Sequence, residues 1–292
     1  MNKNNNIFNI FIWVYILLIC YIIYNKYSFE LFDFSILNYE IDNIKYVEKN
    51  EDEFNDILRK IKGKAKTYYS NIVLITSKII VSSRRFDYAK NRSIYSTETR
   101  YEQTFDTIES IRKKIPDACI FLIDNSNLDI YMYNKLNDLC DVFINPINDK
   151  KLKYYTDKNL YKSIAEGYQI MYFLDLFKQL DIKFDRFFKI SGRYYLNDTF
   201  NYNKYVNNNI IFSNNNKWGI FYYTCFYMIP YSKFNLYENS YKILYNNIKN
   251  TELVQNSIEF ILPQLIGFEN IKLVNHLGVT QRIAVRDEIS DI

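Results

Sequence analysis

Short apolar runs alternate with longer amphipathic segments between residues 70 and 190. The runs have the length and the Val, Ile, Leu and Phe content of strands that are buried on both faces of a sheet. They are Asn71–Thr76, Ala118–Ile123, Asp141–Asn145 and Asp185–Ile190. Helical periodicity between them predicts a helix over Glu98–Ile115 and a longer one over 160–180. This alternation indicates an α/β domain with a mostly parallel central sheet flanked by helices.

The helix over Glu98–Ile115 is expected to pack through one apolar face. Ser96 or Thr97 can cap its first turn, and Pro116 ends it. The face is formed by Tyr101, Phe105, Ile108, Ile111 and Ile115.

The pattern changes after residue 200. Asn209–Ser213 and Trp218–Ile229 read as strands that can pair antiparallel, and Ile271–Val274 reads as a last strand. Helices are expected over 239–248 and 254–266. The sequence contains no repeat and no internal linker, so residues 71–292 are predicted to form one domain.

The N-terminal region contains an apolar segment long enough to cross a membrane. Residues 7–24 are apolar or aromatic except for Asn9, and at about 1.5 Å per residue a helix of this length spans about 27 Å. A cleaved signal peptide is the alternative, but the run is long for one and no cleavage pattern of small residues follows it. Residues 1–27 are therefore expected to be a cytosolic tail and a single-pass, type II membrane anchor.

Residues 28–70 are expected to form a stem between the anchor and the domain. Within it, Phe54, Ile57, Leu58 and Ile61 recur at helical spacing among charged residues, which predicts a short amphipathic helix.

Composition excludes several classes of function. The balance of 37 Lys and Arg against 33 Asp and Glu, with a net charge of +4, is unlike that of a nucleic-acid-binding protein. The 6 glycines form neither a GxGxxG motif nor a P-loop. The single histidine, His276, excludes an HExxH site, and the 4 cysteines contain no CxxC pair. The abundance of Asn, Ile, Lys and Tyr is typical of an AT-rich genome, such as that of a large DNA virus or a protist.

Polar residues follow the predicted parallel strands. Ligands of open parallel sheets bind beyond the carboxyl ends of the strands, so these residues are the candidates for a binding site. They are Thr76 and Ser77 after the first strand, Asp124, Asn125 and Ser126 after the second, and Lys189, Ser191, Gly192 and Arg193 at the end of the fourth.

Several segments resemble predicted glycosyltransferases of viruses and bacteria that have the GT-A fold. They are Tyr95–Ser126, Phe187–Leu196, Lys162-Ser163 with Glu166, and the ending Leu277–Val279 with Ile283–Val285. The resemblance covers residues 71–286 and implies a GT-A-like domain. It implies an enzyme that moves a sugar from a nucleotide-sugar donor to a glycan, lipid or protein acceptor. It also adds Arg100 and Lys162 to the residues expected at the donor site.

One feature of that family is missing from the sequence. GT-A enzymes commonly carry an Asp-x-Asp motif that holds a divalent metal, whereas this chain has Lys189-Ile-Ser-Gly-Arg193 at the equivalent place. Lys and Arg can stabilise the negative charge of a leaving diphosphate without a metal. Lys189 and Arg193, side by side, are therefore predicted to hold the diphosphate, with Arg282 or Arg286 as helpers. Mn²⁺ or Mg²⁺ is the alternative, and Arg193 could instead pair with a carboxylate such as Asp185 or Asp198.

Glu259, which begins a predicted helix, is the candidate general base for the acceptor hydroxyl. Its alternative role is that of a first-turn acid that complements the helix dipole. Asp124 is a candidate for contact with the nucleotide, and Glu166 could simply pair with Lys162. A non-catalytic membrane protein of the same fold, which binds a glycan or a partner, is the second functional hypothesis. A hydrolase is third, because no carboxylates cluster in the sequence.

Overall fold

The computed structural model describes residues 49–86, 89–159, 162–214, 221–246, 258–285 and 288–292. Glu48–Ile292 form a compact unit of their own. The apolar segment 7–24 and Arg286 lie outside the described residues. Among the residues that are described, no helix has the length and apolar character that a membrane span requires.

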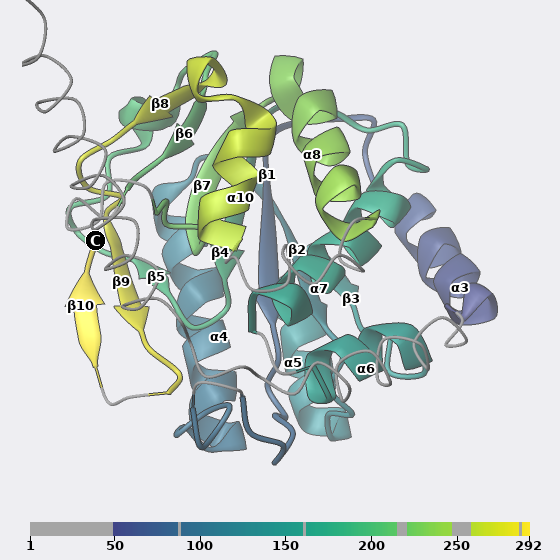
Figure 1. Ribbon diagram of the computed structural model, residues 1–292. Helices are drawn as coiled ribbons and strands as arrows, with labels where there is room; N and C mark the ends of the chain where they lie inside the picture. Colours follow the sequence, from purple (N-terminus) through teal and green to yellow (C-terminus); the bar gives the residue numbers. More distant parts are fainter. Residues whose placement is uncertain (1–48, 87–88, 160–161, 215–220, 247–257, 286–287) are drawn as a thin grey trace, which may run out of the picture. The chain divides into compact units, whose positions relative to one another are not determined.

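A seven-stranded sheet with the strand order β3-β2-β1-β4-β7-β6-β8 forms the centre of the unit (Figure 1). Its first four strands are parallel, as predicted, and β7 runs antiparallel beside β4. β6 pairs antiparallel with β7 and parallel with β8. The strands are β1 (Tyr68–Ser77), β2 (Ala118–Asp124), β3 (Val142–Ile144), β4 (Lys183–Ser191), β6 (Ile210–Phe212), β7 (Phe226–Pro230) and β8 (Ile271–Leu273). The fold is therefore α/β with a mostly parallel central sheet.

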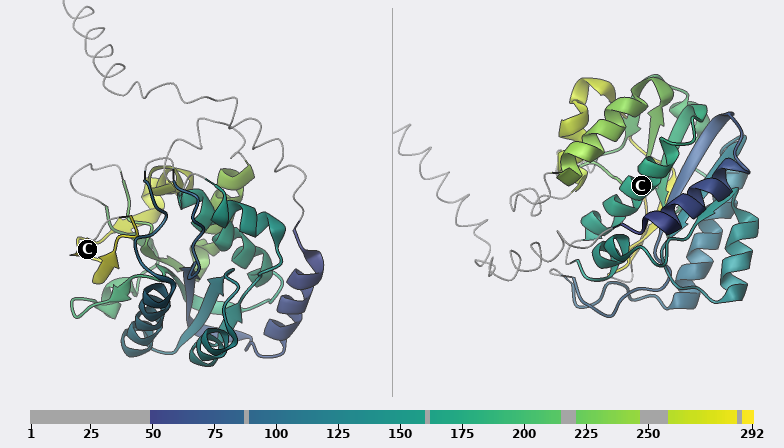
Figure 2. Two further views of the ribbon diagram at one scale, coloured as in Figure 1. Left: turned by 90° about the horizontal axis from the view of Figure 1, so that it is seen from below. Right: turned by 90° about the vertical axis from the view of Figure 1, so that its right-hand side faces the viewer.

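Helices cover both faces of this sheet, so the unit has three layers (Figure 2). Successive side chains of a strand point to opposite faces of the sheet. The parallel strands therefore contribute alternate residues to two cores, one on each face. Val73 and Ile75 pack with Ile108 and Ile111 of α4. On the other face, rings from α7 and α8 pack against Phe121 and Phe187. The helices are α3 (Glu51–Lys62), α4 (Thr97–Lys114), α5 (Ile130–Leu139), α6 (Lys150–Asp157), α7 (Lys162–Phe177), α8 (Phe234–Asn246) and α10 (Ile258–Ile266).

Helix α3 confirms the amphipathic helix that was predicted before the first strand. The face of α3 that carries Phe54, Leu58 and Ile61 is buried. The ring of Phe54 lies edge-on to Tyr172 of α7 at 5.4 Å. Asn50 caps the helix by accepting a hydrogen bond from the Glu53 amide.

A second, three-stranded sheet with the order β10-β9-β5 was not predicted. Its strands are β5 (Tyr195–Leu196), β9 (Val279–Arg282) and β10 (Ile289–Asp291). Strands of two to four residues are too short to show an alternating pattern. This sheet connects the turn after β4 to the C-terminal residues.

Tyr245 of α8 lies across Gly167 of α7. A Cβ atom added at Gly167 would be 1.2 Å from the Tyr245 hydroxyl oxygen, and this hydroxyl donates to the Ser163 carbonyl at 3.2 Å. The Tyr245 side chain is buried and its ring meets Tyr168 edge-on at 5.0 Å. Only glycine leaves room for the ring at this turn of α7.

We predict that Gly167→Ala lowers the free energy of unfolding by about 1–3 kcal/mol, measured by urea denaturation, because the methyl group overpacks the α7–α8 contact. Alanine at an ordinary helical site is instead favoured over glycine by up to about 1 kcal/mol.

Gly63→Ala is the matched control. Gly63 ends α3 with a φ of −71°, and the nearest atom to an added Cβ would be 3.6 Å away. This change should leave stability unchanged or raise it slightly. Equal stability of the two variants would show that Tyr245 does not occupy the space beside Gly167.

Candidate functional site

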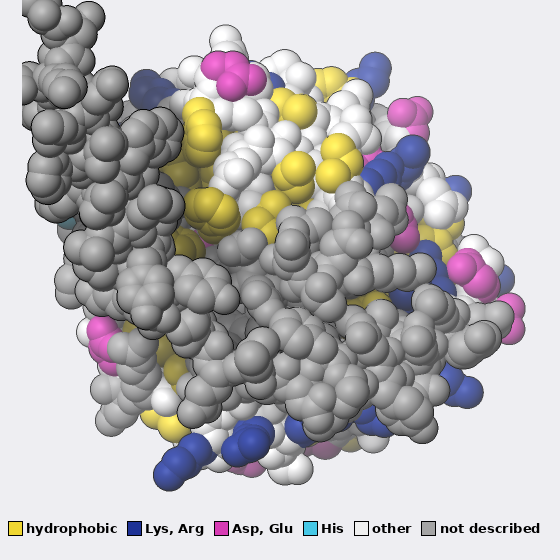
Figure 3. Space-filling model, viewed as in Figure 1, with side chains coloured by type: hydrophobic (Ala, Val, Ile, Leu, Met, Phe, Trp, Pro, Cys, Tyr) yellow, Lys and Arg dark blue, Asp and Glu magenta, His cyan; other side chains and the backbone are white. Residues whose placement is uncertain are grey.

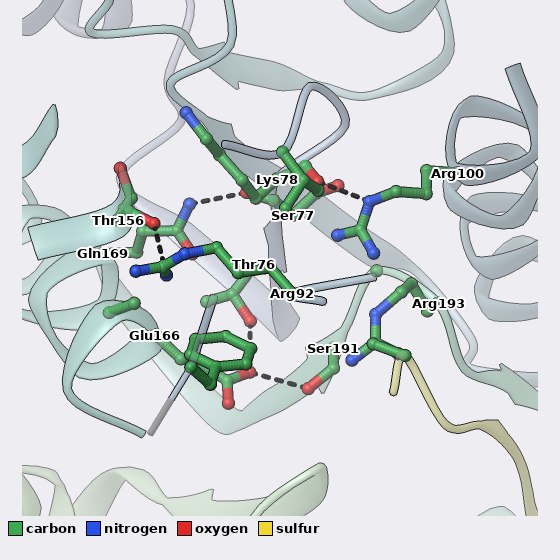
Figure 4. A pocket seen from close by; sticks show the side chains of 15 residues that line it. Thr76, Ser77, Lys78, Arg92, Arg100, Thr156, Glu166, Gln169, Ser191 and Arg193 are labelled. Carbon is green, nitrogen blue, oxygen red and sulfur yellow. Dashed lines mark hydrogen bonds between the residues drawn. The ribbon is translucent and has the colours of Figure 1, made fainter. Parts of the chain in front are cut away.

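A cavity of about 90 Å³ opens at the carboxyl ends of β1 and β4 (Figure 4). This volume holds several water molecules and therefore a small polar group such as a phosphate. We call it the arginine cavity. Its main lining residues are Thr76, Ser77 and Lys78 at the end of β1, Phe86 and Arg92 in the following loop, Arg100 of α4, Thr156 of α6, Glu166 and Gln169 of α7, and Ser191, Gly192 and Arg193 at the end of β4. The sequence predicted six of these: Thr76, Ser77, Arg100, Ser191, Gly192 and Arg193.

Gly192 allows the turn after β4 to lie against the end of β1. Its amide donates to the Thr76 carbonyl at 2.8 Å, and an added Cβ atom would be 2.9 Å from the Ser77 Cβ. Glycine is therefore needed here so that two strand ends can approach each other.

Two buried threonines of α4 hold the same turn. Thr104 Oγ1 donates to the Gly192 carbonyl at 3.0 Å, and Thr107 Oγ1 donates to the Tyr194 carbonyl at 2.7 Å. The predicted face of α4 was partly wrong: both threonines are fully buried, whereas Tyr101 and Phe105 are only partly buried. The helix is rotated towards its threonines because these hydroxyls satisfy carbonyls of the turn that would otherwise be buried without a partner.

Lys189 does not have the predicted role. Its side chain is 1% exposed, and its ammonium donates to Glu166 Oε1 at 2.5 Å, to the Thr224 carbonyl at 2.8 Å and to Ser191 Oγ at 3.1 Å. These bonds use all three N–H groups. Lys189 lines neither cavity described here. The expected pair of Lys189 and Arg193 around a diphosphate is therefore not formed.

Glu166 is the centre of this polar network. The oxygen that accepts from Lys189 also accepts from Thr76 Oγ1 at 2.8 Å and from Ser191 Oγ at 2.7 Å. Figure 4 shows the carboxylate between these two hydroxyls, at the wall of the arginine cavity. The expected partner, Lys162, has a side chain outside the described part, so its predicted role at the donor site stays a prediction.

Arg100 and Arg193 are buried beside the cavity, with 7% and 6% of their surface exposed. Arg100 donates to the Lys78 carbonyl at 2.7 Å and to Ser93 Oγ at 3.2 Å. Arg193 donates to the Arg282 carbonyl at 2.6 Å. Neither has a carboxylate partner within the described residues. The alternative of an Arg193 salt bridge is therefore not found there.

The two guanidinium groups are close enough to repel each other. Burial lowers the pKa of Arg100 to about 9, and the nearby charge of Arg193 contributes to the same shift, while Asp124 and Tyr194 oppose it. Two like charges held out of water raise the electrostatic potential of the cavity, which an anion would lower. The arrangement therefore favours an anionic ligand.

Arg92 adds a third guanidinium that the sequence did not identify. It lies over the Phe86 ring at 4.5 Å and donates to the carbonyls of Arg84, Thr156 and Asn159. Other Lys and Arg side chains line the lower edge of the molecule, where the parallel strands end (Figure 3). This edge should attract anions before they reach the cavity.

Besides Lys189, four predicted donor-site residues do not line the arginine cavity. Arg282 turns towards α4 and pairs with Asp106 at 3.0 Å, so only its carbonyl contributes, through Arg193. Asp124 accepts from the amides of Ile79 and Ser126 at 2.8 and 2.7 Å.

Asn125 and Ser126, like Asp124, form hydrogen bonds within the protein. Ser126 Oγ accepts from the Ile80 amide at 2.9 Å, and Asn125 donates to Thr156 Oγ1 at 2.8 Å. Asp124, Asn125 and Ser126 are all buried. They position the loop after β1, because the short polar side chains satisfy backbone groups nearby.

A second cavity of about 270 Å³ adjoins the first. We call it the aromatic cavity. Glu166 and Ser191 line both cavities, and the rest of this lining is Tyr194, Phe221, Tyr222, Tyr223, Thr224, Cys225, Glu259 and Gln281. Glu259 Oε1 accepts a hydrogen bond from Thr224 Oγ1 at 3.3 Å. The predicted base is therefore not beside the arginines but in the neighbouring cavity.

The residues of the arginine cavity do not fit a divalent metal. Metal ions of this kind prefer several oxygen ligands, but the cavity offers one carboxylate, which already accepts from Lys189. In the described part of the chain, no three His, Cys, Asp or Glu residues come together as a metal site.

Comparison with known proteins gives only distant matches. No protein-family model matches the sequence, and no curated protein matches it. Among solved structures, the apo form of glycosyltransferase GlyE from Streptococcus pneumoniae TIGR4 aligns with a TM-score of 0.42 and 11% identity over 71% of this chain. The bifunctional glycosyltransferase WbbM aligns with a TM-score of 0.43 and 10% identity over 70% of this chain. A nucleoside-diphosphate-sugar pyrophosphorylase from Vibrio cholerae RC9 aligns with a TM-score of 0.41 and 9% identity over 71% of this chain.

The lengths of these proteins differ from that of the aligned region. This chain spans 45% of GlyE, 39% of WbbM and 93% of the pyrophosphorylase. At these identities and TM-scores the similarity says nothing about what this chain binds or catalyses.

We predict that Lys189→Met lowers the free energy of unfolding by about 3 kcal/mol, because it leaves the partly buried Glu166 carboxylate without its cation. Glu166→Gln should also destabilise, because Lys189 is then buried without a counter-charge. The double variant Lys189→Met/Glu166→Gln should be more stable than the sum of the two single changes implies. A double-mutant cycle by urea denaturation measures this coupling, and strictly additive effects would contradict the pairing.

Proposed function

We propose that this protein is a membrane-anchored glycosyltransferase that transfers a sugar from a nucleoside-diphosphate-sugar donor without a metal ion. The observation that carries the proposal is the pair of buried arginines, Arg100 and Arg193, which line a cavity at the carboxyl edge of a parallel sheet and have no carboxylate partner in the described residues. Residues from the segments that resemble GT-A glycosyltransferases line this cavity, among them Arg100, Glu166 and Ala284.

A diphosphate is the anion that suits both the charge and the chemistry. When the bond between the sugar carbon and the diphosphate oxygen breaks, the electron pair stays on the diphosphate, and its negative charge increases. Guanidinium groups that are already in place stabilise this charge and bind phosphate oxygens through their planar N–H pairs. In this role Arg100 and Arg193 replace the predicted pair of Lys189 and Arg193.

The neighbouring aromatic cavity supplies the other half of the reaction. Glu259 lines it, and Glu166 and Ser191 form its common wall with the arginine cavity. In a single displacement, the acceptor oxygen and the diphosphate lie on opposite sides of the carbon that is transferred. A donor sugar bound at Glu166 and Ser191 would have this arrangement, with Glu259 as the base.

The membrane anchor is part of the proposal because of residues 7–24, whose apolar run is long enough to span a bilayer. A non-catalytic binding protein is the alternative, and the missing Asp-x-Asp motif favours it. Binding of a nucleoside diphosphate together with turnover of a nucleotide sugar would distinguish the glycosyltransferase from the non-catalytic protein.

We predict that UDP or GDP, from a panel that also contains CMP, raises the Tm of the protein by several degrees at saturating concentration, because a ligand at about 100 times its Kd adds about 2.7 kcal/mol. Arg100→Met and Arg193→Met should each weaken the affinity about tenfold to hundredfold, measured by calorimetry, since each removes a charged hydrogen-bond donor.

Arg59→Met is the matched control, because Arg59 is exposed on α3 and lines neither cavity. It should bind as the unchanged protein does. Turnover of the corresponding nucleotide sugar should persist in EDTA. The proposal fails if no nucleotide binds, and its metal-free part fails if EDTA abolishes turnover and Mn²⁺ restores it.

We predict that affinity for the nucleoside diphosphate falls by about tenfold between pH 8 and pH 10. The pKa of Arg100 is about 9, so the cavity loses one positive charge as the pH rises through that value. Arg100→Met should lose less affinity over the same range, and this comparison controls for titration of the ligand itself. Parallel pH profiles would contradict the prediction.

The lowered pKa of Arg100 has the opposite effect on the stability of the unliganded protein, which rises with pH. Above pH 9 the unfolded state holds more protons at Arg100 than the folded state does, because the pKa of Arg100 is lowered only in the folded state. The contribution of Arg100 to the free energy of unfolding therefore rises with pH in this window, while the stabilisation by the ligand falls.

A further inference from the structure

We infer that the aromatic cavity binds the acceptor, and that the acceptor is an uncharged saccharide. The inference rests on the proposed function, because it concerns the substrate that receives the sugar. It selects one of the acceptor classes that the sequence left open.

The charges of the cavity argue against an anionic acceptor. Among the described residues that line it, none is Lys or Arg, and two are glutamates. A phosphorylated or carboxylated acceptor would enter next to carboxylates without a compensating cation, which costs binding free energy. The two cavities thus differ in sign, with arginines in one and acids in the other.

The same charges argue against a cationic acceptor. Glu166 accepts from the Lys189 ammonium at 2.5 Å, so its charge is already compensated. Within the described residues, the Glu259 carboxylate accepts one long hydrogen bond, from Thr224 at 3.3 Å, and it can accept a proton from an acceptor hydroxyl. An amine that paired with Glu259 would occupy the one base in the cavity.

The remaining lining suits a polyol. The tyrosines present phenols, and Ser191, Thr224 and Gln281 present hydroxyl and amide groups. These three groups already donate to Glu166, Glu259 and Ser290, and their oxygens can still accept. Burial raises the pKa of Tyr222 and of Tyr223, so both phenols stay protonated at neutral pH. Groups that both donate and accept hydrogen bonds match sugar hydroxyls, which do the same.

Neighbouring elements hold the backbone of Tyr222 and Tyr223, and the Tyr222 ring lies edge-on to Phe212 at 5.9 Å. The Tyr222 amide donates to the Glu259 carbonyl at 3.0 Å, and the Tyr223 amide donates to the Ser213 carbonyl at 2.8 Å. The rings of Phe221 and Phe260 lie 5.9 Å apart. Rigid rings give apolar faces for the C–H groups of a sugar while their polar edges stay available.

The proposed sugar transfer uses groups from both cavities. The acceptor O–H gives its proton to Glu259, and its oxygen forms a bond to the anomeric carbon of the donor. The bond from that carbon to the diphosphate oxygen breaks, and the electron pair leaves with the diphosphate towards Arg100 and Arg193. No other reactant is required.

The inference is tested on the full chain after saturation with the nucleoside diphosphate that binds best. Glucose, galactose and mannose are compared with their 6-phosphates and their 2-amino-2-deoxy forms by saturation-transfer NMR. At least one neutral sugar should bind, its 6-phosphate should bind at least about tenfold more weakly, and its amino form should bind no more tightly. Tighter binding of a phosphate or amine, or no binding of any neutral sugar, overturns the inference.

Two variants separate this inference from the proposed function. Tyr223→Ala should weaken sugar binding at least about tenfold and leave nucleoside-diphosphate affinity unchanged, whereas Tyr231→Ala, at a tyrosine that is 49% exposed and lines neither cavity, should change neither.

Glu259→Gln should bind both ligands but lose about 10²- to 10⁴-fold in transfer rate. Unchanged nucleotide affinity shows that each variant is folded. If nucleotides bind but Tyr223→Ala binds sugars normally, the acceptor inference fails alone. If no nucleotide binds, the proposed function fails first.

Discussion

The close approach of the turn after β4 to the end of β1 is the constraint on which both cavities depend. Gly192 makes it possible, and Thr104 and Thr107 of α4 hold the turn by its carbonyls. With the turn in this place, Ser191 faces Glu166 on one side and Arg193 comes near Arg100 on the other. A bulkier residue at position 192 would separate the two strand ends and change both cavities together.

The ionisable groups at this edge fall into two sets with different roles. Lys189 and Glu166 compensate each other in the interior and fix the wall between the cavities. Arg100 and Arg193 have no such partner in the described region, and the lowered pKa of Arg100 reflects the resulting cost. Groups held in an unfavourable state without a ligand are typical of functional sites, because a ligand of opposite charge relieves the strain.

Much of the central sheet could be predicted from the sequence because each parallel strand is a continuous apolar run with polar residues after it. The rule that ligands bind at the carboxyl edge brought Thr76, Ser77, Ser191 and Arg193 together correctly. The direction in which the Lys189 side chain points could not be predicted, because its partner Glu166 lies 23 residues away on a helix. Arg92 was missed because it lies in an irregular loop, which has no periodicity to interpret.

Helix α8 affects the geometry of both cavities although none of its described side chains lines either one. Tyr245 lies on Gly167, the residue directly after Glu166, and its hydroxyl bonds to Ser163 in the preceding turn. The position of the Glu166 carboxylate therefore depends on the ring volume at position 245. Evolution could alter the spacing between the two cavities by exchanging that ring, while every residue that lines either cavity stays the same.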